Sequence, residues 1–382
     1  MKKALYIGMC QEGSTALMRY NQLTKILEGK YEIQMINIQV CIDETKKVFR
    51  TIGWRYKKGL LIRRINSMIK KEVDATNFYD FIWVDKGVFI TDTITKQLSK
   101  QTSKLIHFTP DPSFYYHQST LFNKSLKYYD FAITTKSFEI KNYQDLFDGK
   151  VILTTQGYDE DQHKSLTKFE DKKYDFSFVG HFEINRAIII RKLLKKGYRI
   201  LLAGPRWYLF SLFIKSKNLC YIGKYLKGEK YTKAISDAYM SIGFLSKWIP
   251  EQHTTRTFEI PACGTLLVTE KTKEIETFFS DEEVLFYNNF FELEDGAKNL
   301  LLNKLDLQKN YQKWKNYLHE YTIHDILTND KDPDILIKSL TENFDSLCHY
   351  DQELDKLSST EKAVIKSIAE LSTNSPQESI IN

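Results

Sequence analysis

Residues 175–204 read DFSFVGHFEINRAIIIRKLLKKGYRILLAG. Two short apolar runs, each ending in glycine, flank a longer segment in which apolar and charged residues recur at helical spacing. This order predicts a β-strand, a helix and a second β-strand. Strands that are apolar throughout and joined by a helix run parallel and are covered by helices on both faces of their sheet.

The same alternation extends over most of the 382 residues, a length that exceeds the usual size of a single hydrophobic core. We therefore predict an α/β protein with two doubly wound, Rossmann-like parallel-sheet domains. The strand candidates are ALYIGM, YEIQMINI, FYDFIWVD, KLIHFTPD, YYDFAITT and VILTTQG in the first half, and DFSFVG, YRILLAG, NLCYIG, YMSIGFL, TLLVTE and VLFY in the second.

A polar segment, DEDQHKSLTKFEDKK, separates the two sets of strands. We expect an N-terminal α/β domain at 1–160, a linker at 161–172 and a C-terminal α/β domain at 173–330. Residues 331–382 are predicted to form a C-terminal helix and a polar tail. Two such domains that face each other enclose a central cleft at the carboxyl ends of their strands, where open parallel sheets bind ligands.

Charge and cysteine content limit the class of partner and the compartment. The formal net charge is +6, from 55 Lys and Arg against 49 Asp and Glu, which suits anionic small molecules or an anionic membrane surface. The basic residues do not form a stripe interleaved with aromatics, so nucleic acid is not an expected partner. Five cysteines without C-x-x-C spacing indicate neither a disulfide framework nor a zinc site, and favour a cytoplasmic protein.

The longest apolar region, residues 200–214, is interrupted by Pro205 and Arg206 and is too short to span a bilayer. Its second part continues into RWYLFSLFIKSK, residues 206–217, which mixes aromatics and cations at helical spacing. Such a segment is more often a packed helix, but an interfacial helix remains the alternative. Peripheral contact with the inner face of the membrane therefore stays open.

The most informative local pattern is TTRTFEIPACGTLLV, residues 254–268. Its threonines can cap a helix that carries Arg256 and Glu259 in its first turn, while Pro261 breaks the usual rules for a long helix. Arg256 at a helix start suits a diphosphate, and Glu259 can accept two hydrogen bonds from a ribose diol. The alternative is an acid that balances the helix dipole and an arginine in a surface ion pair.

Two strand-to-helix junctions offer backbone amides to an anion or a sugar hydroxyl. GMCQEGST is not a P-loop, because Ser14 stands where the lysine belongs, but Gly8, Gly13 and Ser14 could form a ligand-binding turn or a plain tight turn. In the second junction, FVGHFEINR, Gly180 permits close approach of a ligand, and Arg186 either reaches a phosphate or is a solvated helix residue.

Neither of two metal-like patterns predicts a metal site. DED at 159–161 has the D-x-D spacing of metal-dependent transferases but lies in the expected linker, where we assign it to the hinge or a helix start. HEYTIH at 319–324 is one residue too long to place two imidazoles on one helical face. We therefore expect no metal and no cofactor.

The 254–268 pattern resembles the donor-site signature of two-domain GT-B glycosyltransferases, and most closely the spore-maturation-protein-like branch of the group 1 glycosyltransferases. The resemblance extends to FVG with Arg186, to ILLAGPRW and to FFELEDGAKNLL, and more loosely to TPDPS and TTQGYDEDQH. The residues that match the signature itself are Arg256, Phe258, Glu259, Pro261, Ala262, Cys263 and Gly264.

The resemblance implies that the second domain binds a nucleotide-diphosphate sugar and that the first domain binds the acceptor. Glu251 and Glu259 have the spacing of the family's Glu-x7-Glu pair, although the usual residues between them are absent. The remaining candidates are Gly180, Arg186 and Gly264 on the donor side, Gly8, Gly13 and Ser14 in an acceptor-side loop, and His107 and Asp111 as catalytic bases at a strand end.

We expect a metal-independent glycosyltransferase that moves a sugar from a nucleotide-diphosphate sugar, with a UDP-sugar favoured, to a glycan, lipid-linked or protein acceptor. Surface polysaccharide or glycoconjugate synthesis is the expected context. Two alternatives remain, a nucleotide-sugar epimerase of the same fold and a non-catalytic nucleotide- or glycan-binding protein. For His107, the alternative is a hydrogen-bonded histidine at the end of a strand.

Overall fold

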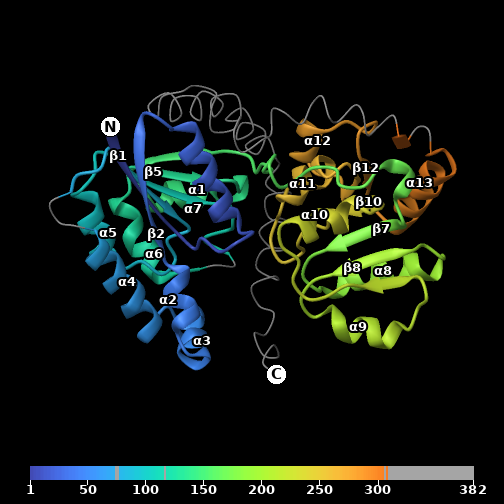
Figure 1. Ribbon diagram of the computed structural model, residues 1–382, viewed down its shortest axis with the longest axis horizontal. Helices are drawn as coiled ribbons and strands as arrows, with labels where there is room; N and C mark the ends of the chain where they lie inside the picture. Colours follow the sequence, from blue (N-terminus) through green and yellow to red (C-terminus); the bar gives the residue numbers. More distant parts are fainter. Residues whose placement is uncertain (74–76, 116–117, 305–306, 309–382) are drawn as a thin grey trace, which may run out of the picture.

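The computed structural model describes residues 1–73, 77–115, 118–304 and 307–308, and it contains two six-stranded sheets side by side (Figure 1). The first sheet has the strand order β2-β1-β3-β4-β5-β6, and every neighbouring pair is parallel. Its strands are β1 (Lys2–Gly8), β2 (Tyr31–Asn37), β3 (Phe81–Asp85), β4 (Leu105–Thr109), β5 (Phe131–Thr134) and β6 (Lys150–Leu153).

The second sheet has the order β12-β11-β10-β7-β8-β9 and is also parallel throughout. The predicted fold class is therefore confirmed, and each of the twelve apolar runs overlaps one strand. The strands of this sheet are β7 (Tyr174–Val179), β8 (Ile200–Ala203), β9 (Leu219–Tyr221), β10 (Ala238–Ile242), β11 (Leu266–Glu270) and β12 (Leu285–Tyr287).

Helices cover both sheets, as the right-handed connection between parallel strands requires. In the first half these are α1 (Thr15–Ile26), α2 (Gln39–Glu44), α3 (Lys47–Tyr56), α4 (Leu60–Glu72), α5 (Asp92–Ser99), α6 (Thr120–Ser125) and α7 (Ile140–Leu146). In the second half they are α8 (Ile184–Lys195), α9 (Trp207–Ile214), α10 (Glu229–Ser236), α11 (Arg256–Ala262), α12 (Ile275–Phe278) and α13 (Phe290–Leu302).

The complete burial of the central strands explains why apolar runs in the sequence were enough to predict where the strands lie. Every residue of β3, β4, β8 and β10 is buried, because helices pack on both faces. The edge strand β9 is only half-buried along its length. No helix in the described part of the chain has the length and apolar character needed to cross a membrane.

The connection between the two sheets packs against the second half. Within the predicted linker 161–172, His163 and Lys172 are buried. The Lys172 Nζ donates to the carbonyl oxygens of Ser236 at 2.6 Å, Ala238 at 2.9 Å and Gly264 at 2.9 Å, while burial lowers its pKa to about 7. The predicted C-terminal helix and tail, 331–382, lie outside the described residues.

The two halves also contact each other directly. Lys136, just after β5, donates to Glu251 Oε1 and to the carbonyl oxygen of His253, both at 3.2 Å. The backbone N–H of Gln156 donates to His253 Nε2 at 3.3 Å. These bonds hold the carboxyl ends of the first sheet next to the segment that precedes α11.

In the second half, β7 and β8 end in a close backbone contact. Gly204 has φ +136°, and a Cβ at this position would lie 1.8 Å from the carbonyl oxygen of Gly180. The same carbonyl accepts the indole N–H of Trp207 at 2.9 Å. Glycine is required here both for the backbone conformation and for the space.

We expect Gly204→Ala to lower the free energy of unfolding by more than about 2 kcal/mol, because it adds a backbone clash to a left-handed strain. Gly29→Ala is the matched control, since Gly29 also has positive φ, +77°, but nothing lies within 4 Å of its Cβ position. The control should cost about 1 kcal/mol. Urea titrations of both variants measure the difference, and equal losses would contradict the clash.

Candidate functional site

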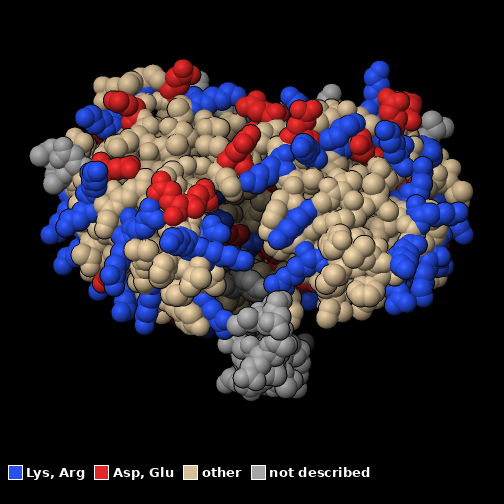
Figure 2. Space-filling view, turned by 60° about the horizontal axis from the view of Figure 1, so that its bottom comes forward, with Lys and Arg blue, Asp and Glu red and all other residues tan. Residues whose placement is uncertain are grey.

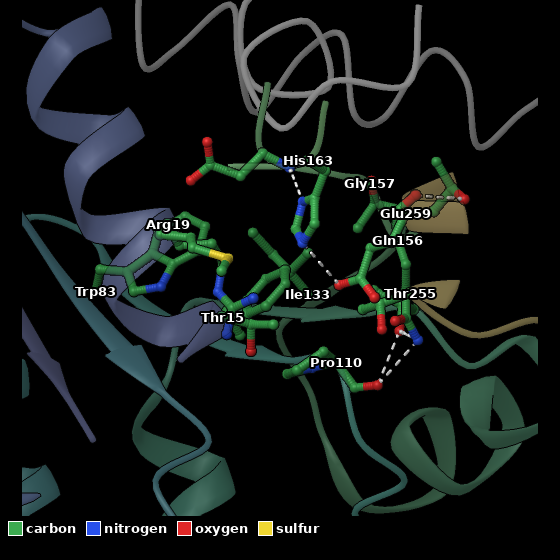
Figure 3. Close-up of a pocket in the computed structure, with 16 residues that line it drawn as sticks. Thr15, Arg19, Trp83, Pro110, Ile133, Gln156, Gly157, His163, Thr255 and Glu259 are labelled. Atoms are coloured by element: carbon green, nitrogen blue, oxygen red, sulfur yellow. Dashed lines mark hydrogen bonds and ion pairs between the residues drawn. The ribbon is translucent and has the colours of Figure 1, made fainter. Parts of the chain in front are cut away.

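A pocket opens between the two halves at the carboxyl ends of the first sheet (Figure 3). Its walls come from the start of α1, the ends of β3 to β6, the segment after β6 and the start of α11. The lining residues are Thr15, Met18, Arg19, Trp83, Phe108, Pro110, Ile133, Thr135, Thr154, Thr155, Gln156, Gly157, Asp159, His163, Thr255 and Glu259.

Glu259 lies in the first turn of α11 and is 6% exposed. Its Oε2 accepts a 2.5 Å hydrogen bond from the Tyr231 hydroxyl. Burial, and then the charge of Glu259, raise the pKa of Tyr231 well above its usual value, so this phenol remains a donor. Glu259 is therefore a carboxylate that the protein holds in one position on the pocket wall.

His163 lies near the other oxygen of the same carboxylate. The backbone N–H of Asp159 donates to His163 Nδ1 at 3.0 Å, which leaves the ring proton of the neutral imidazole on Nε2. This Nε2 lies 3.7 Å from Glu259 Oε1 (Figure 3). Because 3.7 Å is beyond hydrogen-bond range, Oε1 keeps its capacity to accept from a ligand hydroxyl.

Arginines gather near the carboxyl end of β7. Arg186 is 6% exposed, and its guanidinium donates to the His181 carbonyl oxygen at 3.1 Å and pairs with Glu183 Oε1 at 2.6 Å. Burial lowers the pKa of Arg186, and the charge of Arg256 lowers it further. Burial also lowers the pKa of His181, with the charges of Arg186, Arg256 and Arg206 adding to the effect. The region therefore combines these arginines with the carboxylates of Glu183, Glu251 and Glu270.

Two of these arginines have donors to spare. The Nε atoms of Arg186 and Arg256 are buried and have no hydrogen-bond partner within the described residues. Buried N–H groups without partners are costly, and an anionic ligand would satisfy them. Of the six residues predicted for the donor side, the structure thus places Arg256 near Arg186 and on the same helix as Glu259, and of these three only Glu259 lines the pocket.

The other three predicted donor-side residues have different surroundings. The Gly180 N–H already donates to the Ala203 carbonyl at 3.0 Å, so this amide is not available to a diphosphate. Gly264, with φ +69°, follows α11 and lies against Ser165, outside the pocket lining. Glu251 accepts from Lys136 and from the Ser246 N–H, and it joins the two halves.

The two predicted bases lie in unlike environments. His107 is completely buried, stacks near Phe122 with 4.4 Å between ring centroids, and has its Nε2 3.3 Å from the Tyr143 hydroxyl. Burial lowers the pKa of His107 to about 3. The neutral ring belongs to the core and does not line the pocket. Asp111 stands one residue beyond the pocket residue Pro110 and pairs with Lys86 at 2.5 Å.

The loop predicted to contact an acceptor is a closely packed turn. Ser14 caps α1 by accepting from the Leu17 N–H at 3.3 Å. Gly13 has φ +69°, and its Cβ position is 3.0 Å from Lys227 of the second half, while Gly8 packs against Tyr6. The pocket is lined by the next residue, Thr15, rather than by these three.

Sequence reasoning did not find the polar group on the opposite wall. Arg19 is 7% exposed, donates from Nε to Asp85 Oδ2 at 2.7 Å and lies 4.5 Å above the ring of Phe108. Its Nη2 and the Nε1 of Trp83 are buried without a partner among the described residues (Figure 3). An acid at the end of the apolar run FYDFIWVD was the available signal for Asp85, whereas Arg19 looked like an ordinary helix residue.

Comparison with known proteins supports the fold. A family model described as glycosyl transferase-like matches residues 186–329, and no curated protein sequence matches the chain. Sucrose-phosphate synthase from Thermosynechococcus elongatus superposes with a TM-score of 0.61 at 10% identity, over 92% of this chain and all (100%) of that one.

Two further solved structures are similar over comparable lengths. An alpha-glucosyltransferase in complex with UDP and a 13-mer DNA containing a HMU base has a TM-score of 0.60 at 11% identity, covering 90% of this chain and 98% of that one. HepE of Anabaena in complex with UDP and glucose has a TM-score of 0.54 at 11% identity, covering 91% and 100%. The chain therefore has the GT-B fold, with two doubly wound domains facing a central cleft.

The buried state of His107 predicts a specific acid sensitivity. The unfolded chain binds a proton at His107 near pH 6.5, and the folded chain only near pH 3, so the unfolded state binds more protons between these values. Stability therefore rises with pH across this window. We expect His107→Phe to make the slope of unfolding free energy between pH 6 and 4 shallower by up to about 1.4 kcal/mol per pH unit.

Tyr143→Phe is the control for this measurement, because it removes the contact to His107 but keeps the titrating ring. Its slope should match that of the unaltered protein. If His107→Phe leaves the slope unchanged in urea titrations over the pH series, the histidine is protonated in the folded state and the burial argument is wrong.

Proposed function

We propose that this protein is a glycosyltransferase that takes a sugar from a nucleotide-diphosphate sugar bound in the cleft. The observation that carries the proposal is the combination of a fixed carboxylate on the pocket wall, Glu259, with the unpaired donors of Arg186 and Arg256 in the same half of the chain. A carboxylate suits the ribose diol, and arginines suit the diphosphate.

Transfer of the sugar requires that the departing nucleotide diphosphate is stabilised. Fixed guanidinium groups can supply this stabilisation, because they act on the developing charge without reorganisation. We propose that no divalent metal is needed. UDP-sugars are the favoured donors, a choice supported by the UDP found in the similar structures of HepE and of the alpha-glucosyltransferase.

We propose that the acceptor lies against the wall formed by Arg19, Trp83 and Phe108. This wall offers two unpaired donors next to aromatic surface, which suits the oxygens and the apolar face of a glycan or of a glycan carried by a lipid or protein. The rings of Trp83 and Phe108 stack at 5.3 Å. Asp111, beside this wall, is the remaining candidate for the base that activates the acceptor hydroxyl.

A role in surface polysaccharide or glycoconjugate synthesis, in the cytoplasm or at the inner face of the membrane, completes the proposal. The four described cysteines, Cys10, Cys41, Cys220 and Cys263, are free thiols, which suits a reducing compartment.

Glu259→Ala should weaken UDP binding by about ten- to a hundredfold, because it removes the hydrogen bonds of a charged group to ribose. Glu276→Gln, on the exposed surface of α12, is the matched control and should bind UDP normally. Titration calorimetry with UDP, GDP, ADP and dTDP, each with and without EDTA, measures both effects.

The same experiment tests the role of metal. Binding of one nucleotide that survives EDTA and is lost in Glu259→Ala supports the donor site. The donor site is wrong if no nucleotide binds, and metal independence is wrong if EDTA abolishes binding. Release of free sugar or its epimer from a nucleotide sugar without any acceptor would favour the epimerase alternative.

Arg19→Lys should raise the KM for an acceptor about tenfold, because lysine keeps the charge beside Asp85 but loses the guanidinium fork. The dissociation constant of UDP should not change. Steady-state kinetics with a p-nitrophenyl glycoside acceptor measures the KM, and calorimetry measures the dissociation constant of UDP. Arg191→Lys, on the exposed face of α8, is the control, and an unchanged KM in Arg19→Lys would remove Arg19 from the acceptor site.

A further inference from the structure

Helix α3 exposes an apolar face that no described part of the chain covers. Of its ten residues only Gly53 is buried, where it packs against Leu61 of α4. Helices of globular proteins normally turn their apolar side chains toward the core. Here five large apolar residues are exposed in part, by 67% for Val48, 43% for Phe49, 38% for Ile52, 38% for Trp54 and 58% for Tyr56. The Trp54 ring also packs edge-on against the buried Phe89, with 4.7 Å between the ring centroids.

Helix α9 in the second half repeats this feature. Only Trp207 of its eight residues is buried, at the N-terminal end of the helix. The next turns expose apolar and aromatic side chains, and the segment after β9 extends the surface. These exposed residues are Tyr208, Leu209, Leu212, Phe213, Ile222 and Tyr225, of which Phe213 is 81% exposed.

Both apolar surfaces stand in segments that contain cations and no acids. Residues 46–71 include ten Lys and Arg, and residues 199–228 include six, without a single Asp or Glu in either. Together they hold 16 of the 55 basic residues of the chain and none of its 49 acidic ones. The rest of the chain, with 39 basic against 49 acidic residues, is net negative, so positive charge is concentrated around the two exposed helices.

Most of these cations are free to meet a partner. In the described part of the chain, Arg64 is the member of the first segment that pairs with a carboxylate, Glu44, at 2.6 Å. Lys57 is buried and donates to the Trp54 carbonyl. Exposed cations of the two segments include Lys46, Lys47, Arg55, Lys58, Arg63, Lys70, Lys71, Arg206, Lys215, Lys217, Lys224 and Lys227.

The two helices lie on one side of the molecule. In Figure 1, α3 is at the lower edge of the left half and α9 at the lower edge of the right half. Figure 2 turns this lower side forward and shows Lys and Arg prevailing over Asp and Glu on the lower parts of both halves. We call the exposed residues of α3 and α9, with the cations in or directly next to these helices, the lower face; these cations are Lys46, Lys47, Arg50, Arg55, Lys58, Lys215 and Lys217.

We propose that the lower face binds the surface of an anionic phospholipid bilayer, with α3 and α9 lying in the interface. Apolar side chains at the acyl boundary and cations at the headgroups are the two contributions that interfacial helices combine. Duplex nucleic acid would meet the cations but would leave aliphatic residues such as Val48, Ile52 and Leu212 without a partner.

Membrane binding by the lower face does not depend on the proposed transferase activity, but it adds a location for that activity. Contact through both halves would hold the central cleft next to the bilayer, where an acceptor carried by a lipid is found. The alternative of an interfacial helix at 206–217 would then be one half of a surface whose other half, α3, only the tertiary structure reveals.

Sedimentation of the full chain with phosphatidylcholine vesicles, with and without phosphatidylglycerol, tests the proposal. We expect binding to the anionic vesicles, weakened by added NaCl, and little binding to phosphatidylcholine alone. Replacing Lys46, Lys47 and Arg50 together by Gln should lower partitioning on the order of a hundredfold, since each cation contributes about fivefold. Equal binding to both kinds of vesicle, or none to either, would overturn the proposal.

Two double variants test whether the apolar side chains of the lower face contribute to vesicle binding in addition to charge attraction. Phe49→Ser with Ile52→Ser on α3, and Leu212→Ser with Phe213→Ser on α9, should each lower partitioning about tenfold. The matched control is Phe291→Ser with Leu302→Ser on α13, where the exposed fractions are 74% and 77%. Thermal unfolding checks that every variant is folded, and equal losses in control and test variants would contradict the lower face.

Three further outcomes identify the partner of the lower face and distinguish a failure of the membrane proposal from a failure of the donor-site proposal. Duplex DNA that competes with vesicles and binds more tightly would replace the membrane by nucleic acid as the partner. A dimer in light scattering that dissociates in the α3 variant would assign the surface to a second copy of this chain. Glu259→Ala should still bind vesicles, so a failed donor site and a failed membrane surface give different results.

Discussion

Burial of parallel strands on both faces is the constraint on which the rest of this structure depends. The central strands of each sheet have no solvent-facing side, so their residues must be apolar and their polar chemistry must lie beyond the strand ends. Two sheets that meet at these ends bring Arg19 and Trp83 from one half within one pocket with Glu259 from the other. The topology of the two sheets therefore determines where the site lies, and the particular residues determine its chemistry.

Buried charges on the pocket wall and near the carboxyl end of β7 are held by partners that leave some of their atoms unused. Glu259 receives a strong bond at Oε2 and only a distant neighbour at Oε1, while Arg186 is bound through its terminal nitrogens and keeps Nε free. Full pairing would stabilise the empty fold, so the unused capacity is a cost that ligand binding can recover. The same logic separates His107 from these groups, because its ring is enclosed by the core and faces no ligand space.

Positive and negative charges are distributed unevenly over the molecule, and the positive charge surrounds a surface that could contact a membrane. Acid-free segments surround two exposed apolar helices, one from each half, on the same side of the cleft-bearing molecule. A transferase that works on lipid-linked or surface glycans would gain from such an arrangement, because attachment through both halves restricts the search for the acceptor to a plane.

The sequence by itself determined the fold class, all twelve strands and the helix start that carries Arg256 and Glu259. Burial on both faces leaves a local pattern in the strands, whereas the predicted threonine cap is wrong, because Thr255 makes no side-chain hydrogen bond at the start of α11. It could not separate Glu251 from Glu259, or His107 from a true pocket residue, since side-chain direction at a strand end depends on which sheet face meets the other half. Arg19, Trp83 and Asp85 become a site only when α1 and β3 lie side by side. Tertiary structure alone placed α3 and α9 on one face, because residues over 150 positions apart in the chain leave no joint signal in a single sequence.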